Sequence, residues 1–107
     1  MNTPALMTQT KLFFGFNNAE GTARTVSDEA WEEFVVKVVT PRFLGFTVFK
    51  TQGYWRGRAE ESRVVEILWS TGSKADQESI ETIREAYRSI FNQTSVLRVD
   101  DTVGVSF

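Results

Sequence analysis

The sequence predicts an α+β domain of the ferredoxin-like class, with its elements in the order β-α-β-β-α-β. Two observations predict this fold. Two segments carry apolar residues at helical spacing, and four segments alternate apolar and polar residues as strands do. Right-handed crossovers in this order give a four-stranded antiparallel sheet with two helices on one face. The other face of the sheet would then have no helical cover.

The chain begins with a polar segment, residues 1–9, which we expect to be flexible. The segment lacks the basic start and long apolar core of a signal peptide, so we expect a cytoplasmic location. Residues 10–107 are predicted to form a single α+β domain. The first strand is predicted over residues 10–16, where Leu12, Phe14 and Phe16 share one face.

The first helix is predicted to begin after Ser27, whose side chain can accept hydrogen bonds from free backbone N–H groups. Pro41 disfavours helical geometry at Thr40, so we expect the helix to end there. The apolar stripe between these limits contains Trp31, Phe34, Val35, Val38 and Val39.

The second and third strands are predicted over residues 46–56 and 63–69, because both are rich in β-branched and aromatic residues. Gly53 inside the second strand predicts a bulge or a close contact. Residues 57–61 between them are short and polar, which is compatible with a hairpin connection.

The second helix is predicted to begin after Ser73, whose spacing from Asp76 resembles a capping box. The last strand is predicted to begin near Ser95 and to continue its alternation to Phe107. The predicted apolar face of the helix contains Ile80, Ile83, Tyr87, Ile90 and Phe91.

Composition excludes several classes of function. The net charge of −2 disfavours general nucleic-acid binding, which needs an excess of basic residues on one face. The 107 residues include no cysteine and no histidine, so zinc sites, Ser-His triads and Cys-His dyads are excluded within one chain. No apolar run approaches the roughly 20 residues of a membrane helix. We therefore expect no metal, no cofactor and no membrane partner.

Several short segments stand in the order and spacing of a known family. They are residues 12–15 (LFFG), 40–43 (TPRF), 53–56 (GYWR), 93–99 (QTSVLRV) and 105–107 (VSF). In these segments the chain resembles the bacterial family called domain of unknown function thirty-five seventy-four, from about Thr10 to the C-terminus. Many members of the family carry an export signal, and members often have a cysteine where this chain has Gly104. The resemblance implies a domain of this kind but no established activity.

The first candidate site is the group Gln52, Tyr54, Trp55 and Arg56 near the end of the second strand. Tryptophan and tyrosine offer flat surfaces for stacking, and arginine offers a planar fork for carboxylate or phosphate. Together they could hold an anionic, ring-bearing ligand such as a nucleotide. In the alternative interpretation, Trp55 packs in the core and Arg56 is a solvated strand end.

Three further positions could carry chemistry. Arg42 is either a fixed guanidinium for a ligand or a surface cation at the end of the first helix. Glu66 is either a carboxylate in partly dry surroundings, able to act as a base, or an acid on a face toward solvent or a partner chain, paired with Arg63 or Arg98. Arg98 and Asp100 share a face of the last strand, where they form either a polar site beside Glu66 or an ordinary ion pair of a sheet.

These residues leave three functions open. The first is a small-molecule-binding module that acts as a sensor, a carrier or a sequestering protein. The second is a homo-oligomeric interaction domain whose bare sheet face binds another copy. The third is a cofactor-independent isomerase or monooxygenase of the dimeric α+β barrel type, with Glu66, Asp100 or Tyr54 as its acid–base group. The absence of histidine and cysteine favours binding over catalysis.

Overall fold

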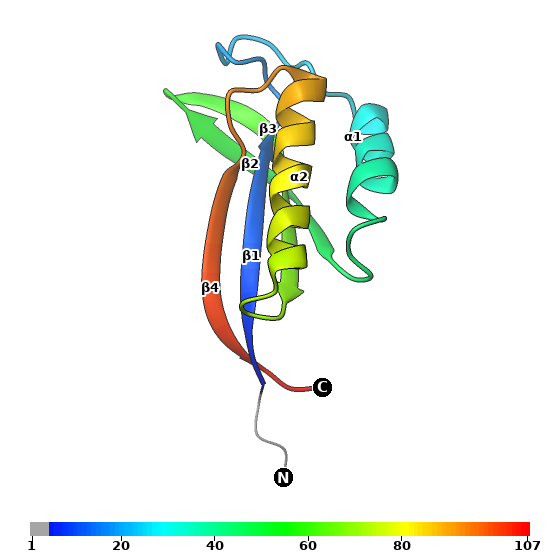
Figure 1. Ribbon diagram of the computed structural model, residues 1–107. Helices are drawn as coiled ribbons and strands as arrows, with labels where there is room; N and C mark the ends of the chain where they lie inside the picture. Colours follow the sequence, from blue (N-terminus) through cyan, green and yellow to red (C-terminus); the bar gives the residue numbers. More distant parts are fainter. Residues whose placement is uncertain (1–4) are drawn as a thin grey trace.

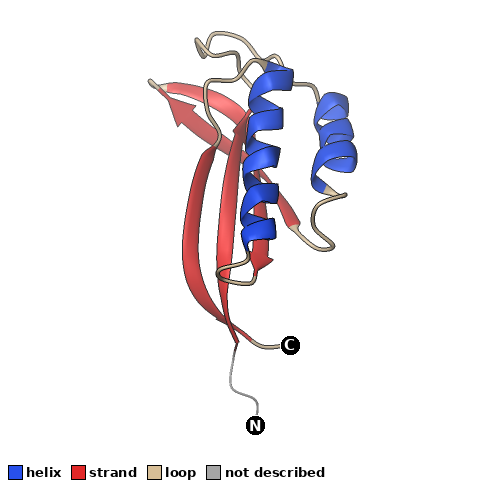
Figure 2. Cartoon of the chain, viewed as in Figure 1, coloured by secondary structure: helices blue, strands red, loops and turns tan. Residues whose placement is uncertain are grey.

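The computed structural model describes residues 5–107 and shows a four-stranded antiparallel sheet with two helices on one face (Figure 1). The strands are β1 (Ala5–Gly15), β2 (Thr47–Trp55), β3 (Arg58–Trp69) and β4 (Leu97–Val105), in the spatial order β2-β3-β1-β4. The helices are α1 (Asp28–Phe34), continued by the π-helical segment η1 (Val35–Val39), and α2 (Lys74–Phe91). Figure 2 shows both helices on the same side of the sheet. The predicted ferredoxin-like α+β fold is confirmed.

Strand β1 begins at Ala5, earlier than the predicted start at Thr10. Residues 5–9 were expected to be flexible, yet they pair with β4 from Ala5 opposite Val105 onward. The side chain of Thr8 is buried and lies 2.8 Å from the hydroxyl of Thr71. Residues 5–9 show no alternating apolar pattern, so the sequence did not predict this part of the strand. It forms because its backbone pairs with β4. Residues 1–4 of the predicted flexible segment lie outside the described residues.

The first helix begins as predicted, since the Ser27 hydroxyl accepts a hydrogen bond from the backbone N–H of Ala30 at 3.1 Å. After Phe34 the helix widens into η1, where the backbone N–H and the hydroxyl of Thr40 both donate to the Val35 carbonyl, each at 2.9 Å. The backbone bond joins residues five apart, as in a π-helix, whereas the bonds of an α-helix join residues four apart. The apolar stripe predicted one continuous helix because it cannot show an extra residue in a turn.

Strands β2 and β3 form a long hairpin in unbroken register. Gly53 lies directly opposite Glu60, and a Cβ atom there would be 3.9 Å from Oγ of Ser62, so neither the predicted bulge nor the alternative close contact is present. The turn consists of Arg56 and Gly57, with φ of 51° and 76°, a conformation typical of a two-residue type I′ turn. Strand β3 therefore begins at Arg58 rather than at residue 63. Its first residues are polar because this arm of the hairpin extends beyond the core.

Helix α2 is capped by Ser73, whose hydroxyl accepts from the backbone N–H of Asp76 at 3.2 Å. Ile80, Ile83 and Tyr87 are buried as predicted, whereas Ile90 is exposed and its predicted place in the core is wrong. Phe91 fills the last contact instead, with its ring centroid 4.8 Å from that of Tyr87. The terminal Phe107 lies beyond β4 and is fully exposed.

The core lies between the sheet and the helices. Its centre is an aromatic cluster in which the ring of Phe14 lies 5.1 Å from Trp31, 5.9 Å from Phe34 and 4.8 Å from Tyr87. The Tyr87 hydroxyl donates a 2.6 Å hydrogen bond to the carbonyl of Gly15. Burial raises the pKa of Tyr87. The cluster thereby joins both helices to the central strand.

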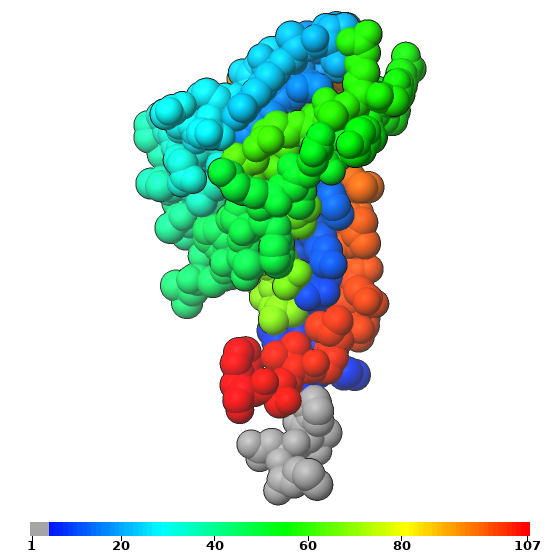
Figure 3. All heavy atoms as spheres, turned by 180° about the vertical axis from the view of Figure 1, so that it is seen from behind, coloured from blue at the N-terminus to red at the C-terminus, as the bar shows by residue number. Residues whose placement is uncertain are grey.

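No helix of residues 5–107 covers the opposite face, which Figure 3 shows from behind and which we term the open face. One row of residues crosses all four strands on this face: Phe49, Val64, Phe13 and Leu97, from β2, β3, β1 and β4 in turn. We term it the apolar row; Val64 is buried and the other three side chains are exposed. Within the described residues, no helix is long and apolar enough to cross a bilayer.

Candidate functional site

A pocket of about 600 Å³ lies on the open face, beside the turn of the β2–β3 hairpin. We term it the hairpin pocket. Its walls are the loop of residues 18–21, the hairpin residues 53–56 and the segment 93–95 after α2, and Phe13, Gly15, Glu60, Ser62 and Leu97 contribute from the strands. Figure 1 shows the three segments meeting at one end of the molecule.

Hydrogen bonds tie the walls of the pocket to one another. The side-chain amide of Gln93 donates to the Asn17 carbonyl at 2.6 Å, and the Asn17 N–H donates to Oε2 of Glu60 at 2.9 Å. Asn92 takes the left-handed conformation that ends α2 and turns the chain toward the pocket. In the other loop, the side chain of Asn18 accepts from the backbone N–H of Thr22 at 2.9 Å. The pocket is therefore bounded by ordered segments.

Two aromatic residues of the hairpin line the pocket, and only Trp55 is on the open face by the strand alternation. Tyr54 is 73% exposed and Trp55 is 58% exposed, although large aromatic side chains normally bury most of their surface. The guanidinium carbon of Arg56 lies 5.6 Å from the centre of the Trp55 ring. The alternative interpretation that Trp55 packs in the core is wrong. The structure brings Tyr54, Trp55 and Arg56 together along the pocket, as the first candidate site requires.

Glu60 is a pocket residue that the sequence reasoning missed. Its carboxylate lies over the backbone of Gly15, where a Cβ atom would be only 2.5 Å from Oε2. A side chain at position 15 would therefore displace the carboxylate from this place. In the sequence, Glu60 looks like a solvated acid of a polar turn. The one available signal was a glycine at position 15, inside a strand of bulky residues.

The remaining predicted residues lie elsewhere. Gln52 is exposed, pairs with Glu61 in the hairpin register and is not among the residues that line the pocket. Arg42 follows η1 and donates to the carbonyl of Val38 at 2.7 Å. This contact agrees with the interpretation of Arg42 as a cation at the helix end.

Arg98 lies on the helix-covered face, and only 10% of its side chain is exposed. It donates to Oε1 of Glu81 at 2.8 Å, to the amide oxygen of Gln77 at 2.5 Å and to Oδ1 of Asp100 at 3.1 Å. These bonds join β4 to α2 beside a second pocket of about 410 Å³. Arg98 and Asp100 face the helices, whereas Glu66 is on the open face. The predicted polar site beside Glu66 is therefore wrong.

Asp100 belongs to a chain of polar contacts under α2. The Trp69 ring N–H donates to the Thr10 hydroxyl at 2.7 Å, and that hydroxyl donates to Asp100 at 2.5 Å. Partial burial raises the pKa of Asp100, but the hydrogen bonds from Thr10 and Arg98, with the charges of Arg98 and Arg84, bring it below its ordinary value. Asp100 is thus held as a carboxylate by its neighbours.

Glu66 is half-buried on the open face, between Lys11 of β1 and Thr47 of β2 in the register. Its predicted partners are engaged elsewhere. Arg63 is 3% exposed on the opposite face, where its guanidinium pairs with Asp28 at 3.1 Å and with Glu61 at 2.7 Å. The predicted pairing of Glu66 with Arg63 or Arg98 is wrong, because the alternation of a strand places those arginines on the other side of the sheet.

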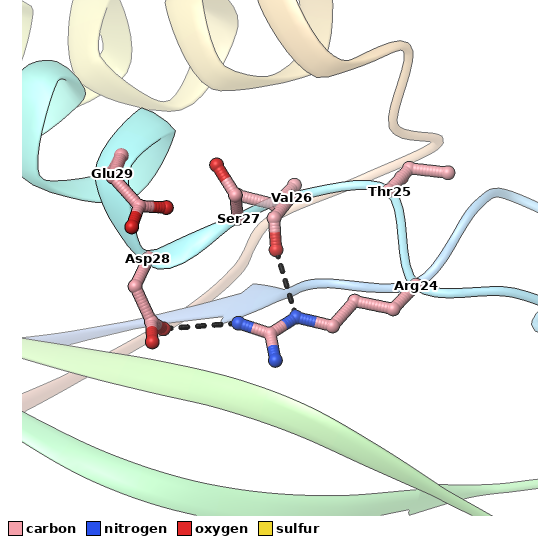
Figure 4. Close-up of a pocket in the computed structure, with 6 residues that line it drawn as sticks. All are labelled: Arg24, Thr25, Val26, Ser27, Asp28 and Glu29. Carbon is pink, nitrogen blue, oxygen red and sulfur yellow. Dashed lines mark hydrogen bonds and ion pairs between the residues drawn. The ribbon is translucent and has the colours of Figure 1, made fainter.

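A further hollow of about 370 Å³ lies at the start of α1, and Figure 4 shows the residues that line it. The Arg24 side chain donates to the Val26 carbonyl and to Asp28, both at 2.9 Å. These bonds hold the loop before α1 against the start of the helix, so Arg24 has a structural role here. No three acidic side chains within residues 5–107 are placed to hold a metal ion.

The sequence matches a family model described as protein of unknown function (DUF3574) over residues 9–107. The chain belongs to this family. Membership confirms the resemblance carried by the short segments between LFFG and the terminal VSF. A search of curated proteins finds no match.

Two solved phage structures share the fold of this family member. One is a phage SAM lyase in complex with S-methyl-5′-thioadenosine, with a TM-score of 0.64 and 15% identity over 94% of this chain and 90% of that chain. The other is a phage SAM lyase in its apo state, with a TM-score of 0.58 and 18% identity over the same shares. At such low identity the likeness shows the fold alone.

Proposed function

We propose that this protein binds a small nucleoside-like molecule in the hairpin pocket. The observation that carries the proposal is the exposed pair Tyr54 and Trp55 beside a pocket whose walls are hydrogen-bonded to one another. A flat ring that packs on a base removes apolar surface from water, and such stacking contributes about 1–3 kcal/mol per base. A volume of about 600 Å³ lies in the range of small-molecule sites.

The structural likeness supports the ligand class. The phage SAM lyase that shares this fold was solved with S-methyl-5′-thioadenosine, which is a nucleoside with a short sulfur-containing tail. The likeness covers nearly the whole of both chains. This is fold-level support only, so the proposal depends on the pocket residues of this chain.

An anionic ligand such as a nucleotide, the ligand expected from the sequence, has less support. Of the three arginines predicted to bind it, Arg42 and Arg98 are engaged elsewhere, and only Arg56 lines the pocket. We therefore propose that the ligand is a nucleoside without the phosphate, and that the protein acts as a sensor, carrier or sequestering protein for it.

The cytoplasmic location expected from the sequence stays part of the proposal. For the isomerase or monooxygenase alternative, Glu66 and Asp100 are on opposite faces and share no site.

Binding can be mapped by nuclear magnetic resonance on the ¹⁵N-labelled protein during titration with S-methyl-5′-thioadenosine, adenosine and adenosine monophosphate. We expect saturable shifts in the amide signals of residues 18–21, 53–56 and 93–95, which line the pocket. Signals of Gln77 and Glu81, which contact Arg98 on the helix-covered face and do not line the hairpin pocket, serve as the internal control. The proposal fails if no probe shifts the pocket signals, or if the shifts appear at the control residues alone.

Self-association through the open face is a second proposed function, carried by the apolar row. Three exposed apolar side chains stand in one row on a face that no helix of the described residues covers, and such a patch is typical of an interaction surface. The next row places Lys11 beside Glu66, so a second copy, rotated by 180°, could meet each charge with the opposite one. The occupant we propose is therefore a second copy of this chain.

Sedimentation velocity across a concentration series tests self-association. We expect the wild type to sediment as a dimer or larger species and Phe49→Glu to shift it to the monomer. Leu44→Glu is the matched control, because Leu44 is fully exposed and lies outside the sheet. A wild type that stays monomeric at every concentration contradicts the proposal.

A further inference from the structure

We infer that Glu60 selects the ligand of the hairpin pocket, and that this ligand is an uncharged or cationic ribonucleoside whose sugar hydroxyls donate to the Glu60 carboxylate. The inference rests on the proposed nucleoside-binding function and deepens it. It names the sugar as the recognised part, and it disfavours a phosphorylated nucleotide.

The Glu60 carboxylate is held in a defined position. Its Oε2 accepts from the N–H of Asn17 at 2.9 Å, and Asn17 is fixed from the other side by Gln93. The same carboxylate lies on the bare backbone of Gly15, which forms the floor of the pocket. Within the described residues, Oε1 of Glu60 accepts no hydrogen bond and stays free for a ligand.

The chemistry of a fixed carboxylate matches the sugar of a ribonucleoside. An ionised carboxylate only accepts hydrogen bonds, and the two neighbouring hydroxyls of ribose can both donate to it. Carboxylates bind the ribose 2′-hydroxyl in this way in dinucleotide-binding proteins. A base that stacks on Trp55 would leave its sugar over the strands, toward Glu60. The carboxylate and the aromatic ring line the same pocket from two arms of one hairpin.

The charge around the pocket also argues against phosphate. The charged residues that line it are Glu20, Arg56 and Glu60, so two acids face one base. The guanidinium of Arg56 already lies over the Trp55 ring. A phosphate group would therefore enter a site of net negative charge, whereas a neutral or cationic substituent would not.

Isothermal titration calorimetry with adenosine, 2′-deoxyadenosine and adenosine monophosphate tests the inference on three proteins. The wild type is compared with Glu60→Gln, whose amide oxygen can still accept from Asn17, and with Glu66→Gln as the matched control. Glu66 lies on the same strand and the same face but is not a lining residue of the pocket.

For the wild type and for Glu66→Gln, we expect adenosine to bind about tenfold more tightly than either 2′-deoxyadenosine or adenosine monophosphate. In Glu60→Gln both ratios should fall toward one. Two outcomes overturn the inference while the proposed function survives, provided that adenosine binds the wild type. In the first, Glu60→Gln keeps the affinity ratios of the wild type. In the second, adenosine monophosphate binds the wild type most tightly. If none of the three probes binds the wild type, both proposals fail.

Discussion

The arginines of the helix-covered face and the aromatic residues of the hairpin pocket differ in how fully their contacts are made. Arg63 and Arg98 are 3% and 10% exposed, and each donates to two acidic side chains. Tyr54 and Trp55 are 73% and 58% exposed, and the strand alternation places Trp55 on the open face. A buried arginine whose guanidinium is paired with acidic side chains has a structural role, because it joins separate elements of the fold. A large aromatic side chain left to solvent is available to a ligand.

The largest effect on folding is expected from Arg63→Ala. This change removes two ion pairs, a hydrogen bond to the Ser62 carbonyl and the packing of the guanidinium over the Phe16 ring, 4.6 Å away. The acids left behind are partly exposed, so we expect the free energy of unfolding to fall by about 2–4 kcal/mol. Urea denaturation measures it.

Arg88→Ala is the control for that experiment, because the Arg88 side chain is 47% exposed, forms an ion pair with Glu85 of the same helix and donates an exposed bond to the Thr94 carbonyl. Its cost should stay within about 0.5 kcal/mol. If Arg63→Ala and Arg88→Ala lower the free energy of unfolding equally, burial does not determine how much an arginine stabilises this fold.

Trp55→Ala tests the other side of the comparison. We expect the affinity for S-methyl-5′-thioadenosine to fall about 5- to 150-fold, since stacking on one aromatic ring contributes about 1–3 kcal/mol. The free energy of unfolding should change by no more than about 0.5 kcal/mol, because the side chain is mostly exposed. Calorimetric titration and urea denaturation of the same sample give both values. A large loss of stability with unchanged affinity would make Trp55 a packing residue.

The smallest effect is expected from Asp100→Asn, and it depends on pH. Because the folded pKa of Asp100 is lowered, its carboxylate stabilises the fold above the unfolded pKa, and this stability is lost as the pH falls through the folded pKa. The side chain is 44% exposed, so solvent screening limits the contribution to under about 1 kcal/mol. Urea denaturation of the wild type and Asp100→Asn at a series of pH values should show their difference shrinking in acid. A difference that is the same at every pH contradicts this assignment.

The order of elements could be predicted from the sequence because the periodicity of apolar residues follows burial. Leu12 and Phe14 alternate as a strand with one buried face, and Ile80, Ile83 and Tyr87 recur as a buried helical face. The first and last residues of the strands could not be predicted in this way, because they depend on partner strands and turns. Ala5 is in a strand because Val105 lies opposite it, and β3 begins as early as Arg58 because the turn before it has only two residues, Arg56 and Gly57.

The candidate site was predicted where its signal was local. Tyr54, Trp55 and Arg56 are adjacent in the sequence and meet at one pocket. Glu60 could not be found in the same way, because its place depends on the hairpin register and on the missing side chain of Gly15. Arg98 was misassigned because the sequence does not show that Glu81 and Gln77 of α2 face it.

The tight turn of the β2–β3 hairpin has a consequence for the speed of ligand exchange. The turn has only two residues between strands in continuous register, and the segment facing it is bonded through Asn17 and Gln93. On its hairpin side, the pocket therefore has no long loop that must open before a ligand enters or leaves. Ligand exchange would then be fast at low affinity, and a variant that binds more weakly would differ mainly in its dissociation rate.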